Sequence, residues 1–109
     1  MERCHTVIVR YHDVDVDPAA VRQFCERNRV KKLSLFGSIL TERFSAQSDV
    51  DVLVEFEPEA APTLLDMVRM ERELGGLLHR KVDLRTPEDL SQYFRRQVQE
   101  MAQMQYERR

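Results

Sequence analysis

Alternation of apolar and polar residues marks three short strands along the chain. It is clearest at 49–56, where three valines and a phenylalanine fall at every second position and most are β-branched. The same pattern, over shorter runs, predicts strands at 31–36 and 81–85. Residues 5–16 alternate only loosely, which predicts an extended N-terminal arm or an edge strand.

Helical spacing of apolar residues separates these strands. A helix is predicted from Asp17-Pro18 to about Asn28, because Asp can cap the first turn and Pro needs no N–H at the first position. A second helix begins at Thr63, with a capping-box-like pattern and a leucine and methionine stripe that runs to residue 78. Gly75-Gly76 inside this stripe predicts a bend or frayed turns there.

The last third of the chain is read as mostly helical. Thr86-Pro87 predicts a capped helical turn, as residues 39–44 do after the first predicted strand. A final helix is predicted from about Ser91. Its expected buried face consists of Phe94, Val98, Met101 and Ala102. Strands and helices therefore alternate in an α/β (α+β) pattern, with residues 1–16 as an arm and 17–109 as a single domain.

Composition narrows the class of protein. The 109 residues carry 17 Lys and Arg against 19 Asp and Glu, a formal charge of −2, with 42% hydrophobic residues. These values are typical of a folded globular domain and exclude a protein that holds nucleic acid by bulk positive charge. The apolar run at 7–9 is too short for a signal-peptide core or a membrane span. Cys4 and Cys25 lack the spacing of a zinc site, which favours reduced thiols in a cytoplasmic protein.

Three aspartates form the main candidate for chemistry. Asp49 and Asp51 are two residues apart on a predicted strand, so both project from the face opposite the core valines. Two neighbouring carboxylates repel each other, and Mg²⁺ relieves the repulsion while it keeps oxygen ligands from water or phosphate. Asp83 lies in another strand that could pair beside the first. A third carboxylate there would suit a site for two metal ions.

Gly37-Ser38 stands where a predicted strand ends and a helical turn begins. Glycine leaves room for a phosphate, and free N–H groups with the Ser hydroxyl could donate to it. Taken alone, an Asp-x-Asp is usually a solvated strand start and a Gly-Ser is usually a turn. His5, His12 and His79 are read as surface residues. The run Arg80-Lys81 is read as a solvated face, with phosphate contact as the alternative.

The combination of Gly37-Ser38, Asp49-x-Asp51 and a later strand Asp83 resembles the minimal nucleotidyltransferases of the DNA polymerase β superfamily. The resemblance covers about residues 17–106. It implies a small mixed β-sheet backed by helices, with Asp49, Asp51 and Asp83 as ligands of Mg²⁺ or Mn²⁺. It also implies transfer of a nucleoside monophosphate, AMP from ATP in the simplest case, with Asp83 as the base for the attacking hydroxyl. Such proteins are commonly antitoxins of HEPN ribonuclease toxins, which are helical partners that they adenylylate on tyrosine.

The chain departs from this family in one respect that bears on activity. Members often carry an arginine shortly after Gly-Ser, whereas Ile39-Leu40-Thr41 is uncharged here. Two functions therefore stay open: an active protein adenylyltransferase, or a weak or inactive antitoxin that neutralises its HEPN partner by binding alone. A polymerase fragment is a third reading, but the chain lacks the basic surface for it. Neither a membrane nor direct nucleic-acid contact is expected. The oligomeric state stays open.

Overall fold

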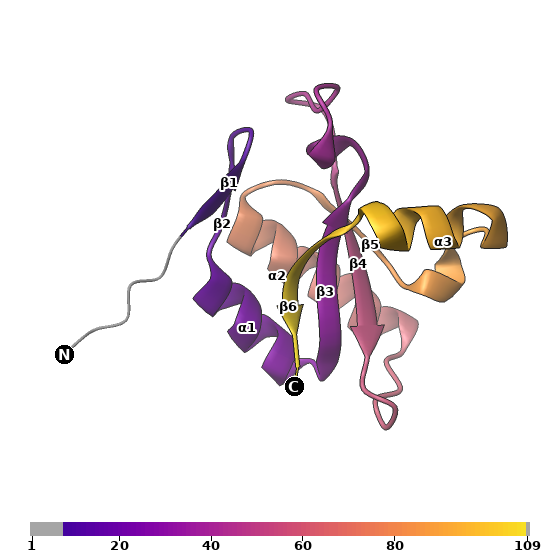
Figure 1. Ribbon diagram of the computed structural model, residues 1–109. Helices are drawn as coiled ribbons and strands as arrows, with labels where there is room; N and C mark the ends of the chain where they lie inside the picture. The colour runs from indigo at the N-terminus through magenta and orange to yellow at the C-terminus, as the bar shows by residue number, and fades with distance from the viewer. Residues whose placement is uncertain (1–7, 109) are drawn as a thin grey trace.

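The computed structural model describes residues 8–108 and contains a four-stranded mixed sheet with helices packed against it (Figure 1). The strand order is β5-β4-β3-β6; β3 is antiparallel to both of its neighbours, and β4 is parallel to β5. The bounds of these strands are β3 Val30–Phe36, β4 Val50–Phe56, β5 Val82–Arg85 and β6 Gln103–Glu107. The expectation of a small mixed sheet backed by helices is therefore confirmed.

Helices α1 (Pro18–Arg27) and α2 (Leu64–Leu78) contact each other and the sheet, α1 against β3 and β6 and α2 against β5. The core between them is formed by the alternate valines of β4, by leucines of β3 and by the inner faces of both helices. Burial of this apolar surface is the main favourable term in folding. None of the helices among residues 8–108 has the length and apolar character that a membrane crossing needs.

The predicted helix caps are present, with one difference inside α2. Asp17 accepts a hydrogen bond from the Ala19 N–H at 3.0 Å, and Thr63 and Asp66 form a reciprocal capping box. The bend or fraying expected at Gly75-Gly76 is absent, since α2 is helical up to Leu78. The helix ends at His79, which takes the left-handed conformation usually given to glycine.

The N-terminal segment forms a hairpin of β1 (Val9–Tyr11) and β2 (Val14–Val16), which pair with each other and not with the main sheet. Val14 and Val16 are buried in the core, while the alternate residues Asp13 and Asp15 are exposed. The part of the predicted arm at residues 1–7, including Cys4 and His5, lies outside the described residues. Cys25 is a free, buried thiol, and burial raises its pKa to about 12.

The C-terminal prediction is wrong in two ways. Helix α3 (Gln92–Met101) has no buried residue, and two members of its expected buried face, Phe94 and Met101, are 60% and 59% exposed. The chain then turns at Ala102 and forms β6, which pairs with β3. Local spacing could not show this strand, because its hydrogen bonds go to a segment about 70 residues earlier in the chain.

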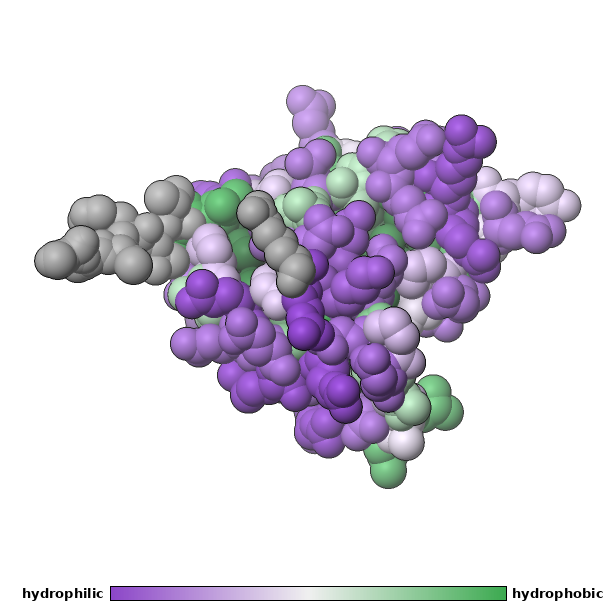
Figure 2. Space-filling view, turned by 60° about the horizontal axis from the view of Figure 1, so that its bottom comes forward, coloured by the Kyte–Doolittle hydropathy of each residue, from purple (hydrophilic) through white to green (hydrophobic). Residues whose placement is uncertain are grey.

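One face of the molecule is mostly polar (Figure 2). Figure 2 shows a face that is largely hydrophilic, with hydrophobic residues gathered only in small areas. Besides α3, exposed apolar side chains occur in the first turns of α2, at Leu64, Leu65 and Val68. Scattered apolar residues of this kind are normal on the surface of a folded protein.

Candidate functional site

The parallel pairing of β4 with β5 places Asp51 directly opposite Asp83. Side chains of residues paired in this way project from the same face of the sheet. Asp49 precedes β4 by one residue and lies two positions before Asp51. The sheet therefore brings the three predicted aspartates to one edge, at the start of β4. We call Asp49, Asp51 and Asp83 the carboxylate rim.

Asp51 is the most perturbed member of the carboxylate rim. Partial burial raises the pKa of Asp51, and the negative charges of Asp83 and then Asp49 raise it further. Arg85 opposes this effect. Asp51 therefore lies in a partly buried place near two other carboxylates, where an added cation would be favourable.

Gly37 touches the carboxylate rim. It follows β3 with a φ of +78°, and Phe36 before it pairs with Asp51 across the sheet. A Cβ at position 37 would overlap with the Asp51 Oδ2. Only glycine fits here, because both the backbone angle and the space exclude a side chain. Ser38 follows in the short 3₁₀ helix η1 (Gly37–Leu40), where its carbonyl accepts hydrogen bonds from the Thr41 N–H and hydroxyl.

Arg85 is a site residue that the sequence reasoning missed. Its Nε and Nη2 donate to the two oxygens of Asp83, at 3.1 and 3.2 Å. Within residues 8–108, no three Asp, Glu, His or Cys side chains converge closely enough to hold a metal ion as they stand. The third carboxylate of the rim, Asp83, is engaged by Arg85. The position of Arg85, two residues after Asp83 on one strand, was the available signal.

Arg80 fixes the loop that leads into Asp49, contrary to its interpretation as a solvated side chain. Its side chain is only 14% exposed. Its guanidinium donates to the carbonyl oxygens of Ser45 and Ser48 at 2.7 and 2.6 Å and lies 4.4 Å from the centre of the Phe44 ring. We call Arg80, Phe44, Ser45 and Ser48 the loop anchor.

The turn of the β1–β2 hairpin contacts the loop anchor. Asp13 pairs with Arg80 at 3.0 Å. His12 stacks on Phe44 with 5.0 Å between ring centres, and its Nε2 lies 3.0 Å from the Ile39 carbonyl oxygen. His12 is exposed, as expected of a surface residue, but it also links the hairpin to the segment after Gly37-Ser38.

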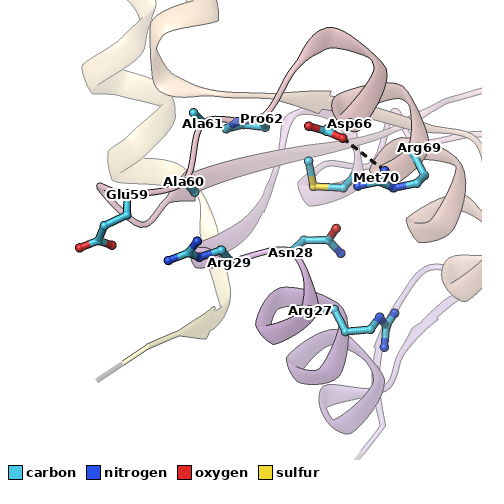
Figure 3. A pocket seen from close by; sticks show the side chains of 10 residues that line it. All are labelled: Arg27, Asn28, Arg29, Glu59, Ala60, Ala61, Pro62, Asp66, Arg69 and Met70. Atoms are coloured by element: carbon cyan, nitrogen blue, oxygen red, sulfur yellow. Dashed lines mark ion pairs between the residues drawn. The ribbon is translucent and has the colours of Figure 1, made fainter.

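A cavity of about 430 Å³ adjoins Gly37-Ser38. It lies between this turn and α3, with a mostly apolar lining that includes Leu40, Val98 and Met101. Such a volume suits a small organic ligand. A second cavity, of about 200 Å³, lies at the opposite end of the sheet and includes Arg29, Glu59 and the Asp66–Arg69 ion pair (Figure 3). None of the predicted site residues lines this second cavity.

Comparisons of sequence place this chain among nucleotidyltransferases. A family model described as "Nucleotidyltransferase domain" matches residues 19–104. The protein adenylyltransferase MntA of Thermococcus cleftensis is 38% identical over 63 residues, which are 58% of this chain and 62% of the relative. A presumed protein adenylyltransferase of Methanocaldococcus jannaschii is 40% identical over 60 residues, 55% of this chain and 62% of the relative. The chain thus spans about three fifths of the length of these curated relatives.

Solved structures agree with the fold. A presumed minimal nucleotidyltransferase superposes with a TM-score of 0.65 at 35% identity, over 78% of this chain and 85% of that one. A tri-AMPylated Shewanella oneidensis HEPN toxin in complex with an MNT antitoxin gives a TM-score of 0.60 at 18% identity, over 84% and 70% of the two chains, a likeness of fold alone. Because the family model covers most of the chain and the fold agrees, the protein belongs to the nucleotidyltransferase-domain family.

Proposed function

We propose that this protein is a Mg²⁺-dependent nucleotidyltransferase that moves AMP from ATP onto a hydroxyl of a partner protein. We further propose that the partner is a HEPN ribonuclease toxin, for which this chain acts as antitoxin. The observation that carries the proposal is the carboxylate rim: three aspartates from two paired strands, with Gly37 packed against one of them. The name of the MntA relative supports the reaction class.

The donor set of the carboxylate rim fits Mg²⁺ or Mn²⁺. Carboxylate oxygens are the ligands these ions prefer. Burial, and then the charges of Asp83 and Asp49, raise the pKa of Asp51, which supports a site where a cation would be stabilising. Asp49, Asp51 and Asp83 would hold the metal. When bound, a divalent ion supplies charge neutralisation at the phosphates and orients the leaving pyrophosphate.

The remaining groups of the site would bind and orient the substrates. Gly37 leaves the approach to Asp51 open for a phosphate, and the apolar cavity beside Ser38 has room for the nucleoside. Asp83 would take the proton of the attacking hydroxyl at a carboxylate oxygen, once that oxygen is free of Arg85. The loop anchor would help to position Asp49, because Arg80 holds the carbonyl oxygen of Ser48, its neighbour in the chain.

The name of the MntA relative, a protein adenylyltransferase, supports a protein acceptor. The acceptor hydroxyl must approach the α-phosphorus to about 3–3.5 Å in line with the leaving group, which demands docking. One of the fold neighbours is a HEPN toxin, AMPylated three times, in complex with its MNT antitoxin. A helical HEPN protein is therefore the partner that we propose.

The alternative function is an antitoxin that neutralises its partner by binding alone. Two observations favour it: the uncharged Ile39-Leu40-Thr41 after Gly37-Ser38, and the engagement of Asp83 by Arg85. Both weaken the support for a bound triphosphate, the first by removing a cation and the second by occupying a carboxylate.

Intact-mass spectrometry of the HEPN partner separates the two functions. We expect wild type, ATP and Mg²⁺ to increase the mass of the partner by whole AMP units. Asp83→Asn should greatly reduce the transfer but leave the complex intact on size-exclusion chromatography. A partner that is neutralised in the complex yet never modified would establish the binding-only function and contradict the enzyme.

A further inference from the structure

Arg85 and Asp83 form a two-point ion pair within one strand. Both belong to β5 at positions i and i+2, so they project from the same face. The guanidinium presents two parallel N–H groups to the two carboxylate oxygens. This fork is the geometry in which arginine binds carboxylate most specifically.

Arg85 interacts unequally with the carboxylates around it. Arg85 is 46% exposed and has Asp83 as its hydrogen-bonded partner, while Asp89 and Asp51 add weaker attraction. Neither Asp49 nor Asp51 forms an ion pair with any of residues 8–108. Arg85, the cation beside the carboxylate rim, thus occupies Asp83, the third carboxylate of the rim.

We propose that Arg85 is the resident counter-cation of Asp83, which a divalent ion must displace before Asp83 can ligate it. The inference rests on the proposed function, because it concerns the same metal site. Arginine stays charged at every pH at which the protein is folded, so this competition cannot be relieved by deprotonation. Arg85 therefore lowers the affinity of the site for divalent cations.

Mn²⁺ titration of the purified chain tests this, with free Mn²⁺ measured by electron paramagnetic resonance. Removing a unit charge near a divalent ion in a half-exposed site should lower the Kd of Arg85→Gln about tenfold. Arg69→Gln is the matched control, because it breaks an exposed ion pair of similar length at the far end of the sheet. We expect its Kd to equal that of wild type.

The route through Asp83 is tested in the Asp83→Asn background. If Arg85 acts by occupying this carboxylate, most of the gain from Arg85→Gln should disappear when residue 83 cannot hold either cation. Thermal melting of each variant without metal confirms that it is folded before titration.

Three outcomes would overturn the proposal, and they differ in what they leave standing. Equal Kd values for wild type and Arg85→Gln would show that Arg85 does not compete. If Arg85→Gln increased the Mn²⁺ affinity equally with Asp83 and with Asn at position 83, Arg85 would act only by long-range repulsion of the ion. In both cases wild type still binds Mn²⁺, and the proposed function survives. Folded wild type and Arg85→Gln that both fail to bind Mn²⁺ would overturn the metal site and, with it, this inference.

Discussion

The loop anchor and the carboxylate rim meet where Ser48 of the anchor precedes Asp49 of the rim, yet charge is matched differently in the two regions. In the loop anchor, Arg80 is largely buried and its guanidinium is matched by two carbonyl oxygens, a carboxylate and an aromatic ring. In the carboxylate rim, the fork of Arg85 binds Asp83 alone, and neither Asp49 nor Asp51 forms an ion pair with any of residues 8–108. Burial, and then the charges of Asp83 and Asp49, raise the pKa of Asp51 in the rim.

This difference separates a structural role from a binding role. A buried charge with all its hydrogen bonds made fixes the backbone around it and has no capacity for a ligand. A group of half-exposed carboxylates with too few cations is stabilised when a cation binds. The loop anchor holds the loop before Asp49 through backbone carbonyl oxygens, so the carboxylates of the rim are not used for this purpose.

The largest effect is expected from breaking the carboxylate rim at its centre. Asp51→Asn should reduce AMP transfer by about a thousandfold, because it removes a metal ligand. It should also abolish the rise in melting temperature that Mg²⁺ and ATP cause in wild type. Intact-mass spectrometry and thermal melting measure the two effects. Asp15→Asn, on the exposed hairpin, should keep both, and an unchanged melting shift in Asp51→Asn would rule out the assigned site.

The loop anchor should show its effect in stability. Arg80→Ala should lower the free energy of unfolding in urea by about 2–3 kcal/mol, because two charge-assisted hydrogen bonds and a ring contact are lost from a largely buried place. Arg69→Ala, which loses one exposed ion pair, should change it by about 0.5 kcal/mol or less. Equal losses in the two variants would show that Arg80 anchors nothing.

Gly37 lies against Asp51 of the rim, and its replacement should give an intermediate effect. Gly37→Ala should destabilise the protein by about 1–2 kcal/mol, through its positive φ and the overlap with Asp51. Because Asp51 must move, the affinity for Mn²⁺ should fall as well. Gly76→Ala is the control: its Cβ would meet nothing within 4 Å, so in a helix it should stabilise by about 0.5–1 kcal/mol. Urea unfolding and Mn²⁺ titration check both variants.

The smallest effect is the pH dependence of stability that Asp51 produces without metal. The pKa of Asp51 is raised in the folded protein above its usual 3.8, so the folded state favours the protonated carboxyl. Its contribution is fully present below pH 3.8 and is lost as the pH rises through the folded pKa. Asp51→Asn should therefore be slightly more stable than wild type at pH 7, with the difference vanishing below pH 3.8. Urea midpoints at several pH values test this, and a variant less stable at pH 7 would contradict it.

The sequence determined the features that depend on neighbouring residues. The caps at Asp17 and Thr63, the period of two in β4 and the side-by-side placement of Asp49 and Asp51 are set by backbone geometry over a few positions. The family motif of Gly37-Ser38 and three aspartates could also be recognised in the sequence, because the motif is defined by the type and order of its residues. These local features were sufficient to indicate the fold class and the family.

Only the tertiary structure decided the features that join distant segments. Strand β6 depends on β3, and the burial of Arg80 needs Asp13 and the loop at 44–48 to meet around it. Asp83 accepts a hydrogen bond from Arg85 on its own strand, whereas the register that sets Asp51 opposite Asp83 is fixed by the pairing of β4 with β5, which are separated in the chain by helix α2. Hydrogen bonds and ion pairs of this kind are made between groups far apart in the chain, so no local pattern of residues encodes them.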